Sequence, residues 1–132
     1  MSVAAGAGAR LTGIEVHGAA GVLARRAADE LGVEAAFLTV DLATDPVAPD
    51  VLADADVVLV NPPRRGLDEP VRDALAARGA GGGRLIYMSC SPASFSRDAQ
   101  ALIAGGWSLE AIEAWDMLPN TAHVELLACF RA

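Results

Sequence analysis

The chain has 132 residues, 53% of them hydrophobic, and a formal net charge of −7. This length suits one domain with a single core, and no apolar run approaches the length of a membrane span. Because nucleic-acid binding depends largely on neutralising phosphates, a chain this acidic is a poor RNA binder by itself. No signal-peptide pattern is visible, and two distant cysteines form neither a disulfide framework nor a zinc set, so we expect a cytoplasmic protein without a metal site.

The first third of the chain predicts two strands joined by a helix. These elements cover Arg10–Val16, Ala19–Leu31 and Ala35–Val40. The helix has apolar residues at helical spacing, and Gly32 follows it as a C-cap signal. Both strands end beside an acid, Glu15 and Asp41 respectively.

Strands and helices continue to alternate in the remainder. After a short helical piece, strands are predicted over Ala55–Val60, Leu85–Met88, Trp107–Asp116 and Val124–Phe130, with helices over Glu69–Arg78 and Ala93–Ile103. The β-branched run Ala55–Val60 is typical of a central parallel strand that is buried on both faces. The alternation indicates an α/β fold, and we expect one domain over residues 1–132.

Cys90 lies where a short apolar strand ends and just before a helix that starts behind Pro92. At the carboxyl end of a parallel strand, a side chain points into the crevice where open α/β sheets bind ligands. A helix start behind a cysteine also favours the thiolate, which is the nucleophilic form. A lone cysteine is more commonly an inert part of a core, so the flanking motifs decide between these interpretations.

Three polar groups accompany Cys90 in the sequence. An acid at the end of a strand, such as Glu15, can accept hydrogen bonds from both hydroxyls of a ribose, and Asp41 occupies a similar position one strand later. Either acid alone is equally consistent with a solvated loop. Asn61-Pro62-Pro63 follows another strand, where two prolines fix the backbone and aim the amide side chain into the crevice; the alternative is a proline-rich turn.

Charged and polar residues follow the Asn-Pro-Pro element and flank the start of the last strand. Arg64 and Arg65 would provide positive charge beside an anionic substrate, although a bare pair of arginines more often lies in a solvated turn. His123 and Glu125 alternate around Val124, so both polar side chains project from one face of the last strand. An acid that faces inward at a strand start has to be paired, hydrated or functional.

Three segments, NPPRRGL, YMSCSPASFSRD and DMLPNTAHVE, resemble the RNA (uracil-5-)-methyltransferase family, which uses S-adenosylmethionine. The NPPRRG form looks most like the bacterial 23S rRNA branch, the RumB or RlmC type. The resemblance covers nearly the whole chain. It implies a Rossmann-like α/β fold with a mostly parallel sheet and helices on both faces, and an RNA partner that presents a uridine in a loop or bulge.

The resemblance also implies a role for each motif residue. Cys90 matches the nucleophile and Glu125 the base. Glu15 matches the acid that binds the cofactor ribose, Asn61 matches the cofactor-side residue of the (D/N)PPR element, and Asp41 lies near the adenine. The candidate substrate-binding residues are Arg64, Arg65 and His123.

The family pattern also contains parts that this sequence lacks. The first cofactor strand with its Gly-rich turn should precede Arg10, where only MSVAAGAGA stands, and the amino-terminal RNA-binding domain and the iron–sulfur cysteines of many members are missing. We therefore expect a truncated catalytic domain that needs an RNA-binding domain from elsewhere.

Two other hypotheses remain open. An amino-group methyltransferase would hold a target nitrogen with Asn61-Pro62-Pro63, although such enzymes usually have an aromatic residue where Arg64 stands. A catalytically inactive methyltransferase-fold remnant would act as a binding module, which the acidic charge and the missing strand favour.

Overall fold

The computed structural model describes residues 8–45, 49–117 and 124–132. It divides the chain into two compact units, unit 1 (Met1–Asp45) and unit 2 (Pro46–Ala132). That residues 1–132 form one domain stays a prediction. In the described ranges, no helix is long and apolar enough to cross a membrane.

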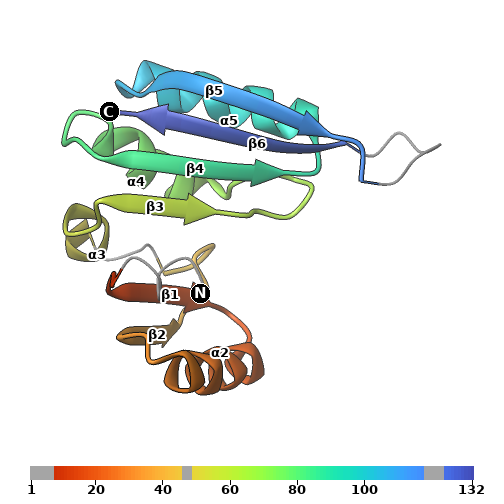
Figure 1. Cartoon of the computed structure of the whole chain (residues 1–132). Coiled ribbons are helices and arrows are strands. Elements are labelled where there is room, and N and C mark those ends of the chain that lie inside the picture. Colours follow the sequence, from red (N-terminus) through yellow and green to blue (C-terminus); the bar gives the residue numbers. More distant parts are fainter. Residues whose placement is uncertain (1–7, 46–48, 118–123) are drawn as a thin grey trace. The chain divides into compact units, whose positions relative to one another are not determined.

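Unit 1 is a parallel pair of strands joined by a helix (Figure 1). β1 (Leu11–Glu15) pairs with β2 (Ala35–Thr39), and α2 (Gly18–Leu31) provides the crossover that parallel neighbours require. The helix has His17 as its N-cap and ends at Gly32, whose φ of 64° lies in the left-handed region that glycine adopts without strain. The predicted strand, helix, C-cap and strand are confirmed.

Unit 2 contains a four-stranded sheet in the order β3-β4-β6-β5 (Figure 1). Its strands are β3 (Val57–Val60), β4 (Arg84–Ser89), β5 (Ser108–Trp115) and β6 (Glu125–Arg131), and its helices are α3 (Pro49–Ala53), α4 (Glu69–Arg78) and α5 (Pro92–Ala104). β3 and β4 are parallel, whereas β6 is antiparallel to both β4 and β5. The sheet is therefore mixed, because the connection from β5 to β6 is too short for the crossover of about a dozen residues that a parallel pair needs.

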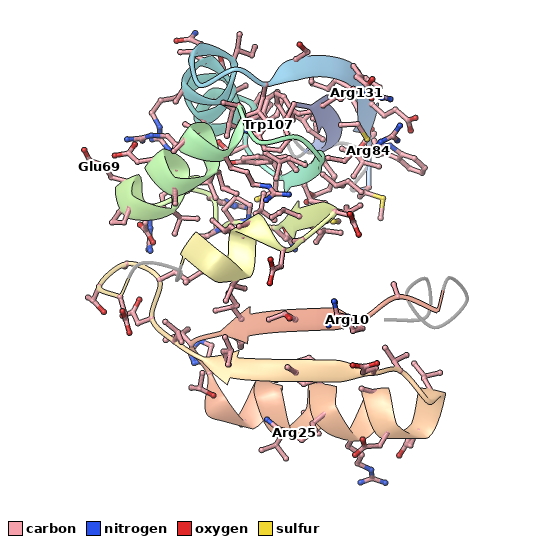
Figure 2. The ribbon with its side chains drawn as sticks, turned by 90° about the vertical axis from the view of Figure 1, so that its left-hand side faces the viewer. Arg10, Arg25, Glu69, Arg84, Trp107 and Arg131 are labelled. Atoms are coloured by element: carbon pink, nitrogen blue, oxygen red, sulfur yellow. The ribbon has the colours of Figure 1, made fainter. Side chains whose placement is uncertain are left out.

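The core of unit 2 lies between the sheet and helices α4 and α5, which cover one face of it (Figure 2). The buried members are Leu67, Leu75, Leu85, Tyr87, Phe95, Ala99, Leu102, Trp107, Leu126, Ala128 and Phe130. The indole N–H of Trp107 donates to the carbonyl of Leu75 at 2.7 Å, so the large ring is buried without losing its hydrogen bond. The rings of Tyr87 and Phe95 pack edge to face at 5.3 Å. This core fixes α5, and with it the end of β4, against the sheet.

The prediction that Ala55–Val60 forms a central strand buried on both faces is wrong for the sheet of unit 2. β3 is an edge strand of that sheet, and Val57 and Leu59 are 51% and 61% exposed. Only the alternate residues, Val58 and Val60, pack against the core. The burial differs from the prediction because α4 and α5 cover only one face of the sheet, whereas the β-branched run supplies apolar residues to both faces.

Candidate active site

Cys90 lies one residue beyond the end of β4, where its sequence context predicts it, and its side chain is half-buried. The serines on either side fix the turn. The N–H of Ser91 donates to the hydroxyl of Ser89 at 3.1 Å. Ser91 is also the N-cap of α5, and its hydroxyl accepts the N–H of Ser94 at 3.4 Å. The cysteine is therefore held between a strand end and a capped helix start.

The register of β4 and β6 brings Cys90 and Glu125 together. The last pair of this ladder is Ser89 opposite Leu126, so Cys90 and Glu125 each lie one residue beyond it, at the same end of the two strands. Glu125 is half-buried, and on its other side it pairs with Trp115 of β5. Cys90 and Glu125, which are distant in the sequence, thus lie at the same end of two paired strands.

The Asn-Pro-Pro loop leaves the sheet at the same edge as Cys90. β3 and β4 run in parallel with Val60 opposite Tyr87, so the chain after Val60 and the chain after Ser89 both emerge at the carboxyl end of the sheet. Asn61 is the first residue of the loop and is exposed. Its amide is therefore accessible at the edge where open α/β sheets bind ligands.

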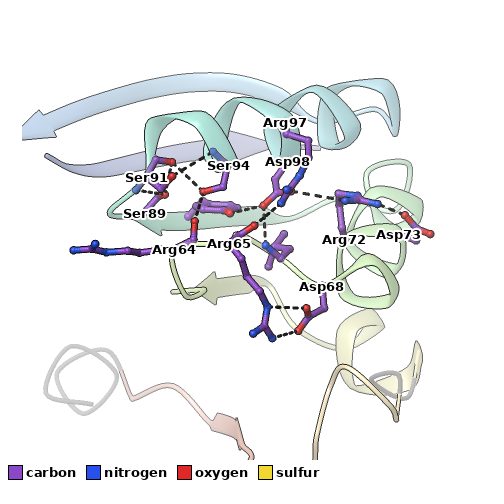
Figure 3. Close-up of polar contacts among 12 residues, drawn as sticks. Arg64, Arg65, Asp68, Arg72, Asp73, Ser89, Ser91, Ser94, Arg97 and Asp98 are labelled. Carbon is purple, nitrogen blue, oxygen red and sulfur yellow. Dashed lines mark hydrogen bonds and ion pairs between the residues drawn. The ribbon is translucent and has the colours of Figure 1, made fainter. Parts of the chain in front are cut away.

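The arginines of this loop have different environments (Figure 3). The guanidinium of Arg65 donates to both carboxylate oxygens of Asp68, at 3.1 and 2.9 Å, and these hydrogen bonds lower the pKa of Asp68. The carbonyl of Arg64 accepts the hydroxyl of Ser94 at 2.9 Å, and the carbonyl of Arg65 accepts a guanidinium N–H of Arg97 at 2.8 Å. The loop backbone is thus bound to α5.

Asp98, the last residue of the YMSCSPASFSRD segment, completes this contact, and the sequence analysis assigned no role to it. It lies fully buried on α5, and its carboxylate accepts the N–H of Leu67 at 2.8 Å, the hydroxyl of Tyr87 at 2.7 Å and two N–H groups of Arg97 at 2.9 and 3.1 Å. Burial, and then the hydrogen bond to Asp98, raise the pKa of Tyr87. The available sequence signal was an acid on the apolar stripe of a predicted helix.

Unit 1 brings its two candidate acids to one edge. Glu15 ends β1, and its carboxylate accepts the N–H of His17 at 3.0 Å. Asp41 follows β2, and its carboxylate accepts the N–H of Ala43 at 3.0 Å. Because Glu15 lies opposite Thr39 in a parallel pair, both acids leave the strands at the carboxyl end.

A shallow hollow of about 170 Å³ lies beside Glu15 within unit 1. Its lining is mostly apolar and consists of Gly13, Ile14, Glu15, Ala20, Gly21, Ala24 and Phe37. A carboxylate at a strand end can accept hydrogen bonds from both hydroxyls of a ribose. Glu15 is therefore the residue of unit 1 that would hold the ribose of S-adenosylmethionine.

The candidate residues divide between the two units. Glu15 and Asp41 belong to unit 1, whereas Asn61, Arg64, Arg65, Cys90 and Glu125 belong to unit 2. His123 lies outside the described residues, as does most of the turn that leads to it. Within the described ranges, no group of three or more His, Cys, Asp or Glu residues could hold a metal ion.

Comparison with known sequences identifies one family. The family model described as tRNA (uracil-5-)-methyltransferase matches residues 51–130. "Uncharacterized RNA methyltransferase YljE" of Lactococcus lactis subsp. lactis (strain IL1403) is 37% identical over 125 residues, which is 92% of this chain and 26% of the relative. The 23S rRNA (uracil(1939)-C(5))-methyltransferase RlmD of Pseudomonas entomophila (strain L48) is 37% identical over 123 residues, 90% of this chain and 26% of the relative.

A third relative is named for a different target uridine. The 23S rRNA (uracil(747)-C(5))-methyltransferase RlmC of Actinobacillus pleuropneumoniae serotype 5b (strain L20) is 35% identical over 119 residues, 89% of this chain and 29% of the relative. The chain thus spans between a quarter and a third of the length of these relatives.

Solved structures agree with the sequence comparison. The Pyrococcus abyssi tRNA (uracil-54, C5)-methyltransferase, in complex with S-adenosyl-L-homocysteine, has a TM-score of 0.78 and 32% identity, over 96% of this chain and 30% of that protein. The N-methyltransferase NodS of Bradyrhizobium japonicum WM9 has a TM-score of 0.58 at 18% identity, over 92% of this chain and 72% of that protein, and shows the fold alone. The predicted Rossmann-like methyltransferase class is confirmed, with a mixed sheet. The chain belongs to the tRNA (uracil-5-)-methyltransferase family, whose members are S-adenosylmethionine-dependent methyltransferases of RNA uracil.

Proposed function

We propose that this chain carries the nucleophile and the base of a methyltransferase that modifies C5 of a uridine in 23S rRNA. The observation that carries the proposal is that Cys90 and Glu125 each lie one residue beyond the last pair of the β4–β6 ladder, at the same end. The choice of 23S rRNA is supported by the NPPRRG form of the loop and by the relatives of the RlmD and RlmC types.

Uracil C5 needs activation, because it is too weak a nucleophile to attack a methyl sulfonium. The Cys90 thiolate adds to C6, which forms a sulfur–carbon bond and moves the electron pair of the C5–C6 double bond towards C5. S-adenosylmethionine, when bound, supplies the methyl group that C5 takes. The Glu125 carboxylate then removes the proton from C5, the pair of the C–H bond restores the double bond, and the thiolate leaves from C6.

The cross-strand geometry suits this sequence of steps. C5 and C6 are bonded neighbours in the ring, so the group that attacks one and the group that deprotonates the other must lie within the width of a base. Cys90 and Glu125 follow the last pair of two neighbouring strands, which lie about 5 Å apart, and this spacing meets that requirement. Because Glu125 and Cys90 come from different strands, the uracil ring can enter between them only when the uridine is unstacked. This requirement favours a uridine in a loop or bulge of RNA.

The remaining residues would hold the two reactants. Glu15 would bind the cofactor ribose, Asp41 would lie near the adenine and Asn61 would bind the cofactor from the loop after β3. Arg64, Arg65 and His123 would contact the RNA. Because the chain carries a net charge of −7, most of the electrostatic attraction for RNA must come from another domain or protein.

Trapping with 5-fluorouridine RNA tests the proposal. Fluorine at C5 cannot be removed as a proton, so the reaction should stop at a covalent protein–RNA adduct that resists denaturation. We expect an S-adenosylmethionine-dependent adduct with a 23S rRNA fragment, none with Cys90→Ala, and an undiminished yield with the matched control Cys129→Ala, whose cysteine is half-buried on β6.

Other outcomes identify the alternatives. An undiminished adduct in Cys90→Ala would contradict the assignment of the nucleophile. Methyl transfer to an amine that survives Cys90→Ala would favour the amino-group methyltransferase. A folded chain that binds no S-adenosylmethionine would favour the inactive binding module.

A further inference from the structure

Three side chains of α5, which we call the loop clamp, bind the backbone of the loop that follows β3 (Figure 3). The clamp consists of Ser94, Arg97 and Asp98. Ser94 donates to the carbonyl of Arg64 at 2.9 Å, and Arg97 donates to the carbonyl of Arg65 at 2.8 Å. These contacts reach across 30 and 32 positions of the sequence, so they fix a tertiary arrangement and not a local turn.

The third member of the clamp brings the loop into direct contact with the helix. Asp98 accepts the N–H of Leu67 at 2.8 Å. Between the bound residues, Gly66 has a φ of 86°, and a Cβ atom there would collide with the Asp98 carboxylate, the Arg97 guanidinium and Cβ of Ser94. The loop can lie this close to the helix because glycine has no side chain.

The clamp also reaches the turn that contains Cys90. The hydroxyl of Ser94 lies 2.9 Å from the carbonyl oxygen of Arg64 and 3.2 Å from that of Ser91, the residue after Cys90. Ser91 is in turn tied to Ser89 at the end of β4. A short chain of polar contacts therefore connects the arginine loop to both sides of the cysteine.

The hydrogen-bond network around Asp98 costs desolvation free energy because it is buried, which points to a role beyond stability. Asp98 is fully buried and satisfies its carboxylate with Arg97, Tyr87 and the loop N–H. Replacing a buried ionic network by apolar side chains is often neutral or stabilising, so such a network is a poor source of stability. What it does provide is a defined geometry for the loop, because a buried polar network whose hydrogen bonds are satisfied rigidifies the structure around it.

We propose that the loop clamp is a positioning device that holds the backbone of Arg64 at a fixed place next to the turn that contains Cys90, so that its guanidinium meets an RNA phosphate when the thiolate meets the base. The inference rests on the proposed function. Figure 3 shows the side chains of Arg64 and Arg65 pointing in different directions, with the guanidinium of Arg65 on Asp68. In a chain with a net charge of −7, a cation attracts a phosphate effectively only where it is held close to it.

The reactivity of Cys90 with charged and neutral reagents tests this placement without RNA or cofactor. In a Cys129→Ser background, the rate with the dianionic 5,5′-dithiobis(2-nitrobenzoate) is divided by the rate with neutral iodoacetamide. A cation held beside the thiol raises this ratio. A change in the fraction of Cys90 that is thiolate affects both rates and therefore largely cancels in the ratio. We expect Ser94→Ala and Arg64→Gln each to lower the ratio about threefold, and the double variant to lower it no further.

The matched control is Ser96→Ala, the same substitution at an exposed position of α5, which should leave the ratio unchanged. A purely structural Ser94 would lower the thermal midpoint and leave the ratio alone, which would overturn the positioning role. A ratio unaffected by Arg64→Gln would overturn the placement of Arg64. If the rate ratios change as expected but no covalent RNA adduct forms, the proposed function is contradicted and the positioning role of the loop clamp is supported.

Discussion

Glu125 is the residue whose replacement should separate the addition of the thiolate from the removal of the proton. Glu125→Gln keeps the size of the side chain but cannot accept a proton. We expect the adduct with 5-fluorouridine RNA to form, while kcat on ordinary uridine falls about 10²- to 10⁴-fold, the usual contribution of a general base. Steady-state methylation with Glu113→Gln, an exposed acid on β5, provides the control. A normal kcat in Glu125→Gln would mean that another group removes the proton.

The Arg65–Asp68 pair predicts a pH-dependent contribution to stability. Hydrogen bonds from Arg65 lower the pKa of Asp68 below its usual 3.8, so the folded value lies below the unfolded one. The pair therefore stabilises the fold above about pH 4, and this contribution is lost as the pH falls through the lower folded pKa. Because the Arg65 side chain is 67% exposed, the contribution is under about 1 kcal/mol.

Urea unfolding of Asp68→Asn at a series of pH values checks this expectation. The variant should be less stable than the wild type near neutral pH, and the difference should shrink below about pH 4. A difference of the same size throughout the series would assign the effect to something other than the charge on Asp68.

Residue-level features were predictable where they depend on sequence neighbours. Cys90 and Asn61 each follow a strand directly, so motif and strand end coincide in the sequence. The contacts of Asp98 were not predictable, because its partners Tyr87 and Leu67 lie 11 and 31 positions away. The juxtaposition of Cys90 with Glu125 likewise depends on the register of two strands, which no local pattern specifies.

At the scale of elements, the contact between the loop after β3 and α5 predicts an unusual cost for one glycine substitution. Gly66→Ala introduces a Cβ atom at a φ of 86° and against two charged groups of the loop clamp. We expect it to lower the free energy of unfolding by about 2–4 kcal/mol, from backbone strain and overpacking together.

Gly32→Ala is the control for the strain alone. Gly32 has a φ of 64°, and nothing lies within 4 Å of a Cβ atom built there. Its replacement should cost about 1 kcal/mol. Chemical denaturation measures both, and equal losses for the two variants would contradict the tight contact between loop and helix.

The bounds of the helices and strands follow from the local sequence pattern, whereas the pairing and burial of the strands do not. Helical spacing and capping residues identify α2 within one residue of its observed start and at its observed end. The direction of β6 and the exposure of one face of β3 depend on which strands pair and on which face the helices lie. A continuous β-branched run supplies apolar side chains to both faces and so cannot distinguish a central strand from an edge strand.

At the scale of the whole chain, family and fold class were predictable because three motifs occur in the family order. The sequence alone did not indicate the division into unit 1 and unit 2, since it contains no linker-like segment at Asp45 and Pro46. The acidic charge is a property of the whole chain, and under the proposed function it requires the main RNA contacts to lie outside this chain.

Release of tritium from RNA labelled with [5-³H]uridine tests the central claim most directly. Methylation of C5 must expel the hydrogen bound to that carbon, so a 23S rRNA fragment should lose one tritium to water for each methyl group it gains. We expect release to require S-adenosylmethionine, Cys90 and Glu125 together. Methyl transfer that leaves the tritium on the RNA would show that the acceptor is another atom and would contradict the proposed function.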